Sequence, residues 1–411
     1  MTLGIEIEGE FAMPRRVWLL IIGMLVNVTG NSFLWPLTTI YMHDHLGKSL
    51  SLAGLVLMAN AGAAVVGNLL GGMLFDKIGG YKSIMGGIII SIFALAGLTL
   101  WHDFVPFVVF YTIIGFSGGI VFPSMYAMVG TVWPEGGRKA FNAIYLAQNV
   151  GVAIGPAMAG FLAAYSFDYI FAANLGMYIL FFFIALFGFK KMSISSTGHT
   201  SVFNEGKKIR NRAPFYALLI VSIGYLLCWV GYVQWQSTIS AYTQEIGITL
   251  PQYSLLWTLN GVLIVAGQPF IRPIMKRIED NIKQQLVIGI AIMMVSYLVV
   301  AFAQEFSMFV IAMAILTIGE MFVWPAVPAL ANQLAPKGRE GFYQGIVNSV
   351  ATGGRMIGPL LGGVMVDLYG MPALFILVTL LLVVAIGASL VYDRPLKKQE
   401  AEKLKETYTV D

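Results

Sequence analysis

Two charged residues of this sequence stand inside long apolar stretches and are its strongest candidates for chemistry. One of them, Glu320, lies within residues 311–330, which are otherwise hydrophobic or small residues and proline. An ionised carboxylate at the centre of a hydrocarbon span is costly, so intramembrane acids usually line a water-filled cavity or a proton path. Glu320 could therefore bind and release a proton or recognise a cation. The alternative is a structural carboxyl group that bonds a neighbouring helix.

The other is Arg355, which the sequence places at nearly the same depth as Glu320 on the next apolar segment. A nearby cation favours the ionised carboxylate, whereas desolvation favours the protonated one. A movement that separates the two residues, or dries the site, would load or release a proton. Two alternatives stay open: a static pair that holds two helices together, and an anionic substrate bound by Arg355.

Polar and aromatic residues at compatible depths form a candidate substrate cavity. Trp324 is one helical turn from Glu320 and shares its face. An indole beside a carboxylate suits a lipophilic cation, through a cation–π contact worth roughly 0.5–2 kcal/mol. Each of these residues could instead pack between helices or anchor the chain at a membrane interface. The candidate cavity residues are Asn31, Trp35, Asn149, Tyr232, Gln234, Trp235, Asn260 and Trp324.

The elements that position these residues are predicted to be membrane-spanning helices. Of the 411 residues, 58% are hydrophobic and only 11% are charged, and the mean hydropathy is +0.78. A soluble domain of this length could not hide so much apolar surface. Because a span needs roughly 20 apolar residues, we predict an all-α membrane protein with twelve transmembrane helices, near 17–41, 50–75, 82–101, 104–131, 141–165, 168–189, 214–242, 252–274, 284–303, 306–333, 342–366 and 371–392.

The distribution of basic residues predicts the orientation in a cell membrane. Of the 25 Lys and Arg residues, 23 lie on one side, in the even-numbered loops, at the span ends that adjoin them, or at the two ends of the chain; the exceptions are Lys48 and Arg355. By the positive-inside rule, both termini are then cytoplasmic in a multi-pass, presumed bacterial protein. The formal net charge of +4 is therefore an orientation signal rather than a nucleic-acid footprint.

An internal repeat divides the chain into two halves of six helices. At an offset of about 200 residues, an ordered series of residues coincides: Trp35 with Trp235, Asn60 with Asn260, Gly67 with Gly267, Pro123 with Pro325, and Gly155-Pro156 with Gly358-Pro359. Such order predicts a duplication, with the substrate site near the midplane between the repeats. The predicted parts are a cytoplasmic N-terminal segment (1–16), a first half (17–189), a basic cytoplasmic linker (190–213), a second half (214–392) and a cytoplasmic tail (393–411).

The loop after the second span carries the most specific motif, formed by Gly72, Asp76, Lys77, Gly79 and Lys82. Glycine permits a sharp chain reversal, and a carboxylate at a helix end can accept hydrogen bonds from the N-terminus of a neighbouring helix. Asp76 could thus latch the cytoplasmic side shut. The alternative is a tight turn with solvated charges. The segment resembles the signature loop of the major facilitator superfamily, although Gly80 and Tyr81 stand where basic residues are usual.

A second motif lies in the fifth span and contains Gly151, Gly155 and Pro156. Glycines four residues apart let helices approach closely, and plain helix packing would explain them equally well. The motif resembles that of drug–proton antiporters in the same superfamily, with Ala159 in place of a glycine. Two further patches are similar to multidrug efflux proteins of the LmrP type: Arg138-Lys139 with Tyr145–Asn149, and Gly319-Glu320 with Pro325. Where such relatives carry an acid in the fifth span, this chain has Ile144 and Tyr145, so the proton stoichiometry stays open.

The residues and the resemblance together predict a secondary active transporter of the major facilitator fold. It would export lipophilic cationic or neutral compounds in exchange for protons by alternating access. An importer or flippase of a sugar, an organic anion or a lipid precursor, driven by protons, is the alternative. We expect a monomer whose partners are its small-molecule substrate, protons and the lipid bilayer, with no nucleic acid.

An enzyme is not expected, because the interiors of the spans contain one acid and no histidine for a catalytic set. Nor does the sequence predict a cofactor or a metal site. Its one cysteine is Cys228, its four histidines lie in loops, and a nucleotide-binding signature is missing. Coupling to an ion gradient is then the expected source of energy, and the sequence leaves open whether the ion is H⁺ or Na⁺.

Overall fold

The protein folds into long helices, and the computed structural model describes residues 13–133, 137–192, 212–278, 281–336 and 340–408. In chain order the elements are α1 (Arg15–Leu34), α2 (Thr38–Ile40), the π-helix η1 (Tyr41–His45), α3 (Leu50–Ile78), α4 (Gly80–Leu100), α5 (Phe104–Val132), α6 (Gly137–Ala163), α7 (Phe167–Gly188), the 3-10 turn η3 (Lys190–Met192), α8 (Ala213–Tyr232), the 3-10 turn η4 (Val233–Trp235), α9 (Thr238–Glu245), α10 (Leu250–Ile278), α11 (Ile282–Ala301), α12 (Phe306–Leu334), α13 (Glu340–Val391) and α14 (Arg394–Tyr408).

The described helices agree with the predicted all-α membrane fold. Ten stretches in the described ranges are long and apolar enough to cross a membrane, and a bent pair within α10 adds another. One of the ten stretches covers α13, which is broken at Gly370, where φ is 79°. Glycine adopts this left-handed backbone without a steric penalty. Because α13 thus contains two helices joined at Gly370, the described ranges hold twelve candidate spans, the number that the sequence predicts.

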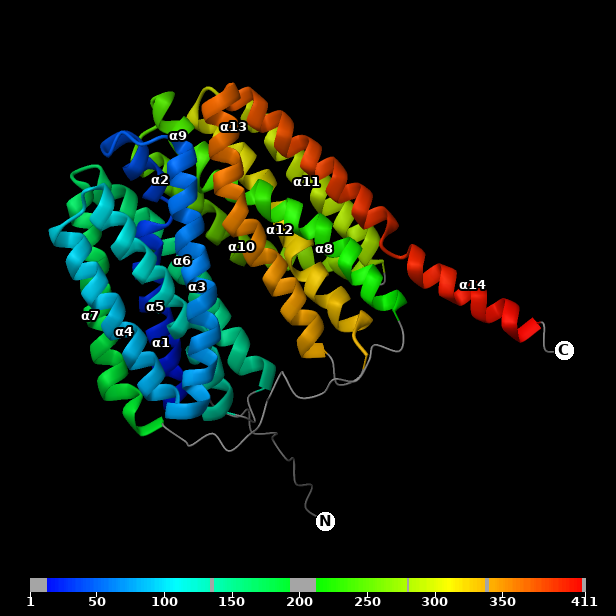
Figure 1. Cartoon of the computed structure of the whole chain (residues 1–411), viewed down its shortest axis with the longest axis horizontal. Coiled ribbons are helices and arrows are strands. Elements are labelled where there is room, and N and C mark those ends of the chain that lie inside the picture. The colour runs from blue at the N-terminus through cyan, green and yellow to red at the C-terminus, as the bar shows by residue number, and fades with distance from the viewer. Residues whose placement is uncertain (1–12, 134–136, 193–211, 279–280, 337–339, 409–411) are drawn as a thin grey trace, which may run out of the picture.

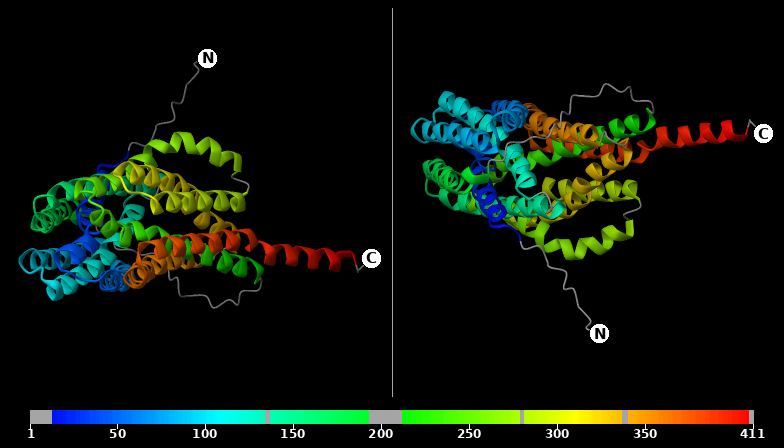
Figure 2. Two further views of the ribbon diagram at one scale, coloured as in Figure 1. Left: turned by 90° about the horizontal axis from the view of Figure 1, so that it is seen from above. Right: turned by 90° about the horizontal axis from the view of Figure 1, so that it is seen from below.

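The helices form two bundles that lie side by side (Figures 1 and 2). The first contains α1 and α3 to α7, and the second contains α8 and α10 to α13. Buried apolar side chains of the second bundle form one continuous core with part of the first bundle, and the rest of the first bundle has a second core. In a membrane this packing supplies much of the association energy, because lipid tails are as apolar as the helix faces.

Small residues allow the tightest helix contacts in both halves. A Cβ atom on Gly155 of α6 would stand 2.7 Å from the Thr29 carbonyl oxygen of α1. At the repeat-related position in α13, a Cβ atom on Gly358 would collide with the side chain of Val233, the residue that directly follows α8, and would stand 3.2 Å from Val230. Real Cβ atoms almost never lie within 3.0 Å of another group, so only glycine lets these helix pairs approach so closely. The repeat in the sequence therefore has a repeat in the packing.

The two halves meet near one end of the molecule, which we call the closed end. It holds the turns at residues 46–49, 101–103, 164–166, 246–249 and 302–305, together with Gly370. Described contacts between the halves join α3 to α13, α6 to α10 and α2 to α9. For example, the Thr258 hydroxyl of α10 donates to the Ala153 carbonyl of α6 at 2.9 Å. Toward the opposite end, where α1 begins and α14 leaves the second half, the ribbons of the halves diverge (Figure 1).

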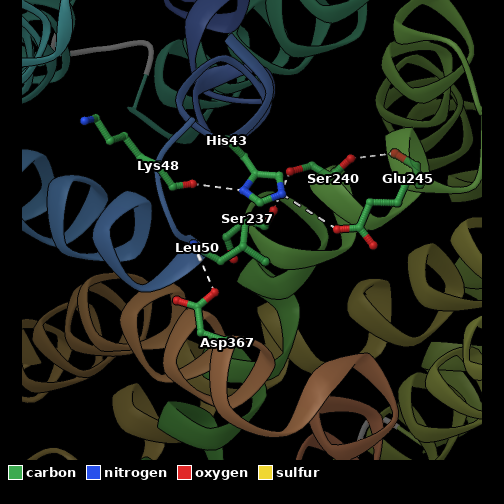
Figure 3. A network of polar contacts seen from close by, with 8 residues as sticks. His43, Lys48, Leu50, Ser237, Ser240, Glu245 and Asp367 are labelled. Carbon is green, nitrogen blue, oxygen red and sulfur yellow. Dashed lines mark hydrogen bonds and ion pairs between the residues drawn. The ribbon is translucent and has the colours of Figure 1, made fainter. Parts of the chain in front are cut away.

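Polar contacts secure the closed end across the two halves (Figure 3). The Asp367 carboxylate of α13 accepts hydrogen bonds from the backbone N–H groups of Leu50, at 3.2 Å, and Ser51, at 2.7 Å, in the first turn of α3. Such a carboxylate also complements the helix dipole. Nearby, Nε2 of His43 lies 3.7 Å from the Glu245 carboxylate. Both contacts join one half of the chain to the other.

The predicted polar segments before, between and after the two halves are described only in part. Residues 1–12 of the predicted N-terminal segment and most of the predicted linker, at 193–211, lie outside the described residues. The predicted tail contains a helix, α14, which projects from the second half (Figure 1). Its base is fixed by Asp393, which pairs with Lys283 of α11 and Lys397 of α14 at 2.9 Å each.

Candidate substrate and proton site

Glu320 lies on α12 and is 2% exposed. Its carboxylate accepts a hydrogen bond from the Asn260 side-chain amide of α10, which also donates to the Thr317 hydroxyl at 2.9 Å. The other carboxylate oxygen accepts from the Trp324 indole N–H at 3.0 Å. The Tyr232 hydroxyl also interacts with this carboxylate. Side chains from α8, α10 and α12 therefore surround one buried acid.

Aromatic rings form the wall beside this acid. Trp324 stacks on Trp229 of α8 with ring centroids 4.3 Å apart and ring planes inclined by 11°. Tyr225 and Tyr232 meet Trp324 edge-on, at 5.6 and 5.4 Å. Rings at these separations attract one another beyond the area that they bury. The carboxylate thus lies at the edge of an aromatic cluster formed by Tyr225, Trp229, Tyr232 and Trp324.

Arg355 joins this cluster from the side away from Glu320. Its guanidinium lies over the Trp229 ring, 4.9 Å from the ring centroid. Among the described residues, the ion pairs within 4.0 Å do not include a pair between Glu320 and Arg355. The two charges are instead connected through the Trp229–Trp324 stack. The direct pair considered from the sequence is not formed in this conformation.

The cluster reaches the first half of the protein through Trp257 of α10. Trp257 lies 6.1 Å from Tyr232 and meets Trp35, which directly follows α1, edge-on at 4.7 Å. Trp35 is partly exposed, and its indole N–H donates to Ser32 at 3.2 Å. A chain of aromatic rings therefore runs from Arg355 to the interface between the halves.

The structure brings four of the eight predicted cavity residues into this region: Trp35, Tyr232, Asn260 and Trp324. The others lie elsewhere. Gln234 is buried and donates to the Val230 and Gly358 carbonyls at 2.8 and 2.9 Å, which ties α8 to α13. Trp235 is fully buried in the core. Asn149 donates to the Tyr145 carbonyl of its own helix, and Asn31 accepts from Tyr178.

The two predicted motifs occupy separate places. The loop motif spans the end of α3 and the start of α4, where Gly79 adopts a φ of 86° and Lys77 and Lys82 are exposed. Asp76 lies in the last turn of α3, but its side chain is outside the described part of the structure. Gly72 has open space beside its Cα. In the second motif, Gly151 and Gly155 pack against α1, and Pro156 lies inside α6.

Sequence reasoning missed three aromatic residues and one hydroxyl of the site. Tyr225 and Trp229 precede Tyr232 by seven and three residues, so the helical spacing places all three on one face of α8. That spacing was a usable signal. Thr317 lies one turn before Glu320 on α12 and shares Asn260 with it. Trp257 had no such signal, because its contact with Trp35 joins the two halves.

The acid has no counterpart in the first half. Under the offset that aligns Pro123 with Pro325, the position equivalent to Glu320 is Gly118 on α5, which has open space beside it. The counterpart of Asn260, Asn60, donates to the Tyr111 carbonyl instead of to a side chain. The repeat thus supplies a common frame, and the second half alone carries the buried carboxylate. Within the described ranges, no three His, Cys, Asp or Glu side chains lie close enough to share a metal ion.

Comparison with known proteins identifies the family. The profile of the Major Facilitator Superfamily matches residues 20–243 and 236–409, so the two matches together cover nearly the whole chain. The chain belongs to the major facilitator superfamily. It is therefore a multi-pass membrane transporter and not an enzyme.

Two relatives match nearly the whole chain, one named only as a transporter and the other named for drug resistance. The chain is 57% identical over 385 residues to the uncharacterized MFS-type transporter YttB of Bacillus subtilis (strain 168), covering 94% of this chain and 97% of YttB. It is also 25% identical over 404 residues to the quinolone resistance protein NorA of Staphylococcus aureus (strain COL), covering 96% and 99% of the two chains.

Solved structures confirm the superfamily fold. The peptide transporter POT superposes with a TM-score of 0.81 at 15% identity, over 94% of this chain and 96% of that chain. A POT family transporter in complex with 5-aminolevulinic acid gives a TM-score of 0.80 at 16% identity, over 93% and 96%. At these identities the likeness concerns the fold alone.

Proposed function

We propose that this protein exports lipophilic cationic or neutral compounds in exchange for protons, with Glu320 as the proton site. The observation that carries the proposal is the environment of Glu320: a single acid, 2% exposed, with an N–H donor from Asn260 on α10 and another from Trp324 on its own helix. The resistance named for the NorA relative supports export rather than import.

Exchange would follow from competition for one carboxylate. The ionised form accepts both N–H donors, but its burial away from water makes the charge costly. A proton removes that cost, and so does a substrate cation held against the aromatic cluster. Because the proton and the cation satisfy the same group, binding of one disfavours the other. Antiport is the expected consequence of that competition.

The conformation supports access from one side. The halves are in contact at the closed end and diverge toward the end where α1 begins and α14 leaves the second half (Figure 1). If both termini are cytoplasmic, as the positive-inside rule predicts, this is an inward-facing state that receives substrate from the cytoplasm or inner leaflet. The two predicted six-helix halves, 17–189 and 214–392, would rock against each other during transport. A single monomer would suffice for this movement.

A transport assay with a charge-removing variant tests the proposal. In inside-out vesicles an exporter moves its substrate from the medium into the lumen. With an imposed proton gradient, Glu320→Gln is expected to abolish this transport (efflux in the cell) of the fluorescent cation ethidium. The matched control is Glu305→Gln, which removes an exposed acid at the start of the same helix and should leave efflux intact. Undiminished ethidium efflux by Glu320→Gln would remove Glu320 from the mechanism.

The alternative is a proton-coupled importer or flippase of a sugar, an organic anion or a lipid precursor. Arg355 supports it, because its side chain is exposed and lacks a carboxylate partner among the described residues. Overexpression separates the two functions. An exporter should raise resistance to lipophilic cations, whereas an importer should improve growth on a scarce solute without changing resistance.

A further inference from the structure

Arg355 has hydrogen-bonding capacity that the protein does not use. A guanidinium carries five N–H donors and stays charged under all ordinary conditions. In the described structure Arg355 is exposed, and it donates a long hydrogen bond of 3.4 Å to the Thr352 hydroxyl of its own helix. A cation at this depth in a membrane protein usually pairs with an acid or lines a pathway. Among the described residues, no carboxylate forms an ion pair with Arg355.

The contact with Trp229 limits the directions in which Arg355 can bind. The guanidinium carbon lies over the Trp229 ring, 4.9 Å from its centroid, and this ring in turn stacks on Trp324. A guanidinium that lies flat on an indole keeps its N–H groups in the guanidinium plane, pointing outward at the edge. That edge is the geometry that accepts a carboxylate through two parallel hydrogen bonds.

Glu320 does not compete for this position. Its carboxylate is held by Asn260 and Trp324, and two stacked indole rings separate it from the guanidinium. The site therefore presents a negative group and a positive group on either side of one aromatic wall. A ligand that lies across the edges of the two stacked indole rings can reach from one charge toward the other.

We infer that Arg355, supported by Trp229, is a binding subsite for the carboxylate of planar aromatic substrates, zwitterions included. The inference rests on the proposed export function and narrows its substrate class. The ring system of such a substrate packs across the edges of the partly exposed Trp229 and Trp324 rings. The substrate carboxylate accepts hydrogen bonds from the N–H groups at the edge of the Arg355 guanidinium. A cationic group at the other end of the substrate approaches Glu320.

Two dyes that share one ring system test the inference. Rhodamine 123 is a cationic methyl ester, and rhodamine 110 is the corresponding free acid. Efflux of each dye is measured in inside-out vesicles for the wild type, Arg355→Gln and Arg355→Lys. Arg277→Gln is the matched control, since Arg277 is an exposed arginine of α10. Binding of each dye to the purified protein in detergent, followed by tryptophan quenching, reports the subsite without transport.

We expect Arg355→Gln to weaken binding and efflux of the free acid by about tenfold or more. This is the effect expected from losing one or two charge-assisted hydrogen bonds. The ester should change by less than about twofold, below the effect of one neutral hydrogen bond. Arg355→Lys should recover part of the loss, because an ammonium keeps the charge but not the planar fork.

Three outcomes would overturn the subsite. They are an equal loss for both dyes in Arg355→Gln, no loss for either, and a wild type that exports the ester but neither binds nor exports the acid. A wild type that exports neither dye, yet binds the acid through Arg355, would instead refute the proposed export function and leave the subsite standing.

Discussion

At the scale of single residues, the buried carboxylate depends on one amide. Asn260 donates both to Glu320 and to Thr317, so it links α10 to two successive turns of α12. A buried acceptor that loses its donor is left with a desolvation cost of about 1–3 kcal/mol. Asn260 and Glu320 should therefore be coupled energetically rather than act as independent sites.

A double-mutant cycle measures that coupling. Asn260→Leu should lower the thermal stability of the detergent-solubilised protein, and the loss should be smaller in a Glu320→Gln background. We expect an interaction energy of about 0.5–3 kcal/mol. The control is Asn60→Leu, at the repeat-related position in the first half, where the amide bonds a backbone carbonyl instead. Its effect should add to that of Glu320→Gln, and additivity at Asn260 would contradict the coupling.

At the scale of helices, close packing of α6 on α1 needs a residue without a side chain at Gly155. A Cβ atom there would crowd Thr29 at 2.7 Å, as well as Ser32. Gly358 plays the same part between α13 and α8. The glycine motif that resembles an antiporter signature is thus explained by packing in both halves, whatever further part it has in transport.

Alanine substitution separates packing from helix propensity. Gly155→Ala should destabilise the protein by about 1–3 kcal/mol, because overpacking forces neighbouring groups to move. Gly176→Ala on α7 is the control, since open space surrounds that position and alanine favours a helix by up to about 1 kcal/mol over glycine. Thermal unfolding in detergent reports both. Equal melting temperatures for the two variants would show that α1 and α6 have room to separate.

At the scale of the whole molecule, the closed end sets the conformation. Asp367 from the second half accepts hydrogen bonds from the first turn of α3 in the first half. A carboxylate in this position is worth up to about 2 kcal/mol in favourable, partly buried geometries. Because the contact joins the two halves, its loss should favour conformations in which the closed end opens.

Cysteine accessibility tests whether the Asp367 contact holds the closed end together. Ser254 is buried at the contact between α10 and Gly160, and Cys228 is the only native cysteine. In a Cys228→Ser, Ser254→Cys protein, adding Asp367→Ala should raise the rate of maleimide labelling by about tenfold, which corresponds to about 1.4 kcal/mol. The control is Asp168→Ala, because Asp168 pairs with His102 inside the first half. Unchanged labelling after Asp367→Ala would exclude the latch.

The sequence by itself determined the class of fold and the identity of the buried charges. Apolar length, loop charge and an ordered repeat predict twelve helices in two halves, because these are properties of local composition and of spacing along the chain. The same reasoning found Glu320 and its neighbour Trp324, since both lie on one helix face.

Only the tertiary structure decided which groups meet. It placed Asn260 on Glu320, inserted two indoles between Glu320 and Arg355, and moved Gln234 from the candidate cavity to a helix contact. Depth along a span predicts the level of a side chain in the membrane but not its direction around the helix relative to a neighbour. That direction follows from helix packing, which depends on contacts between residues far apart in the chain.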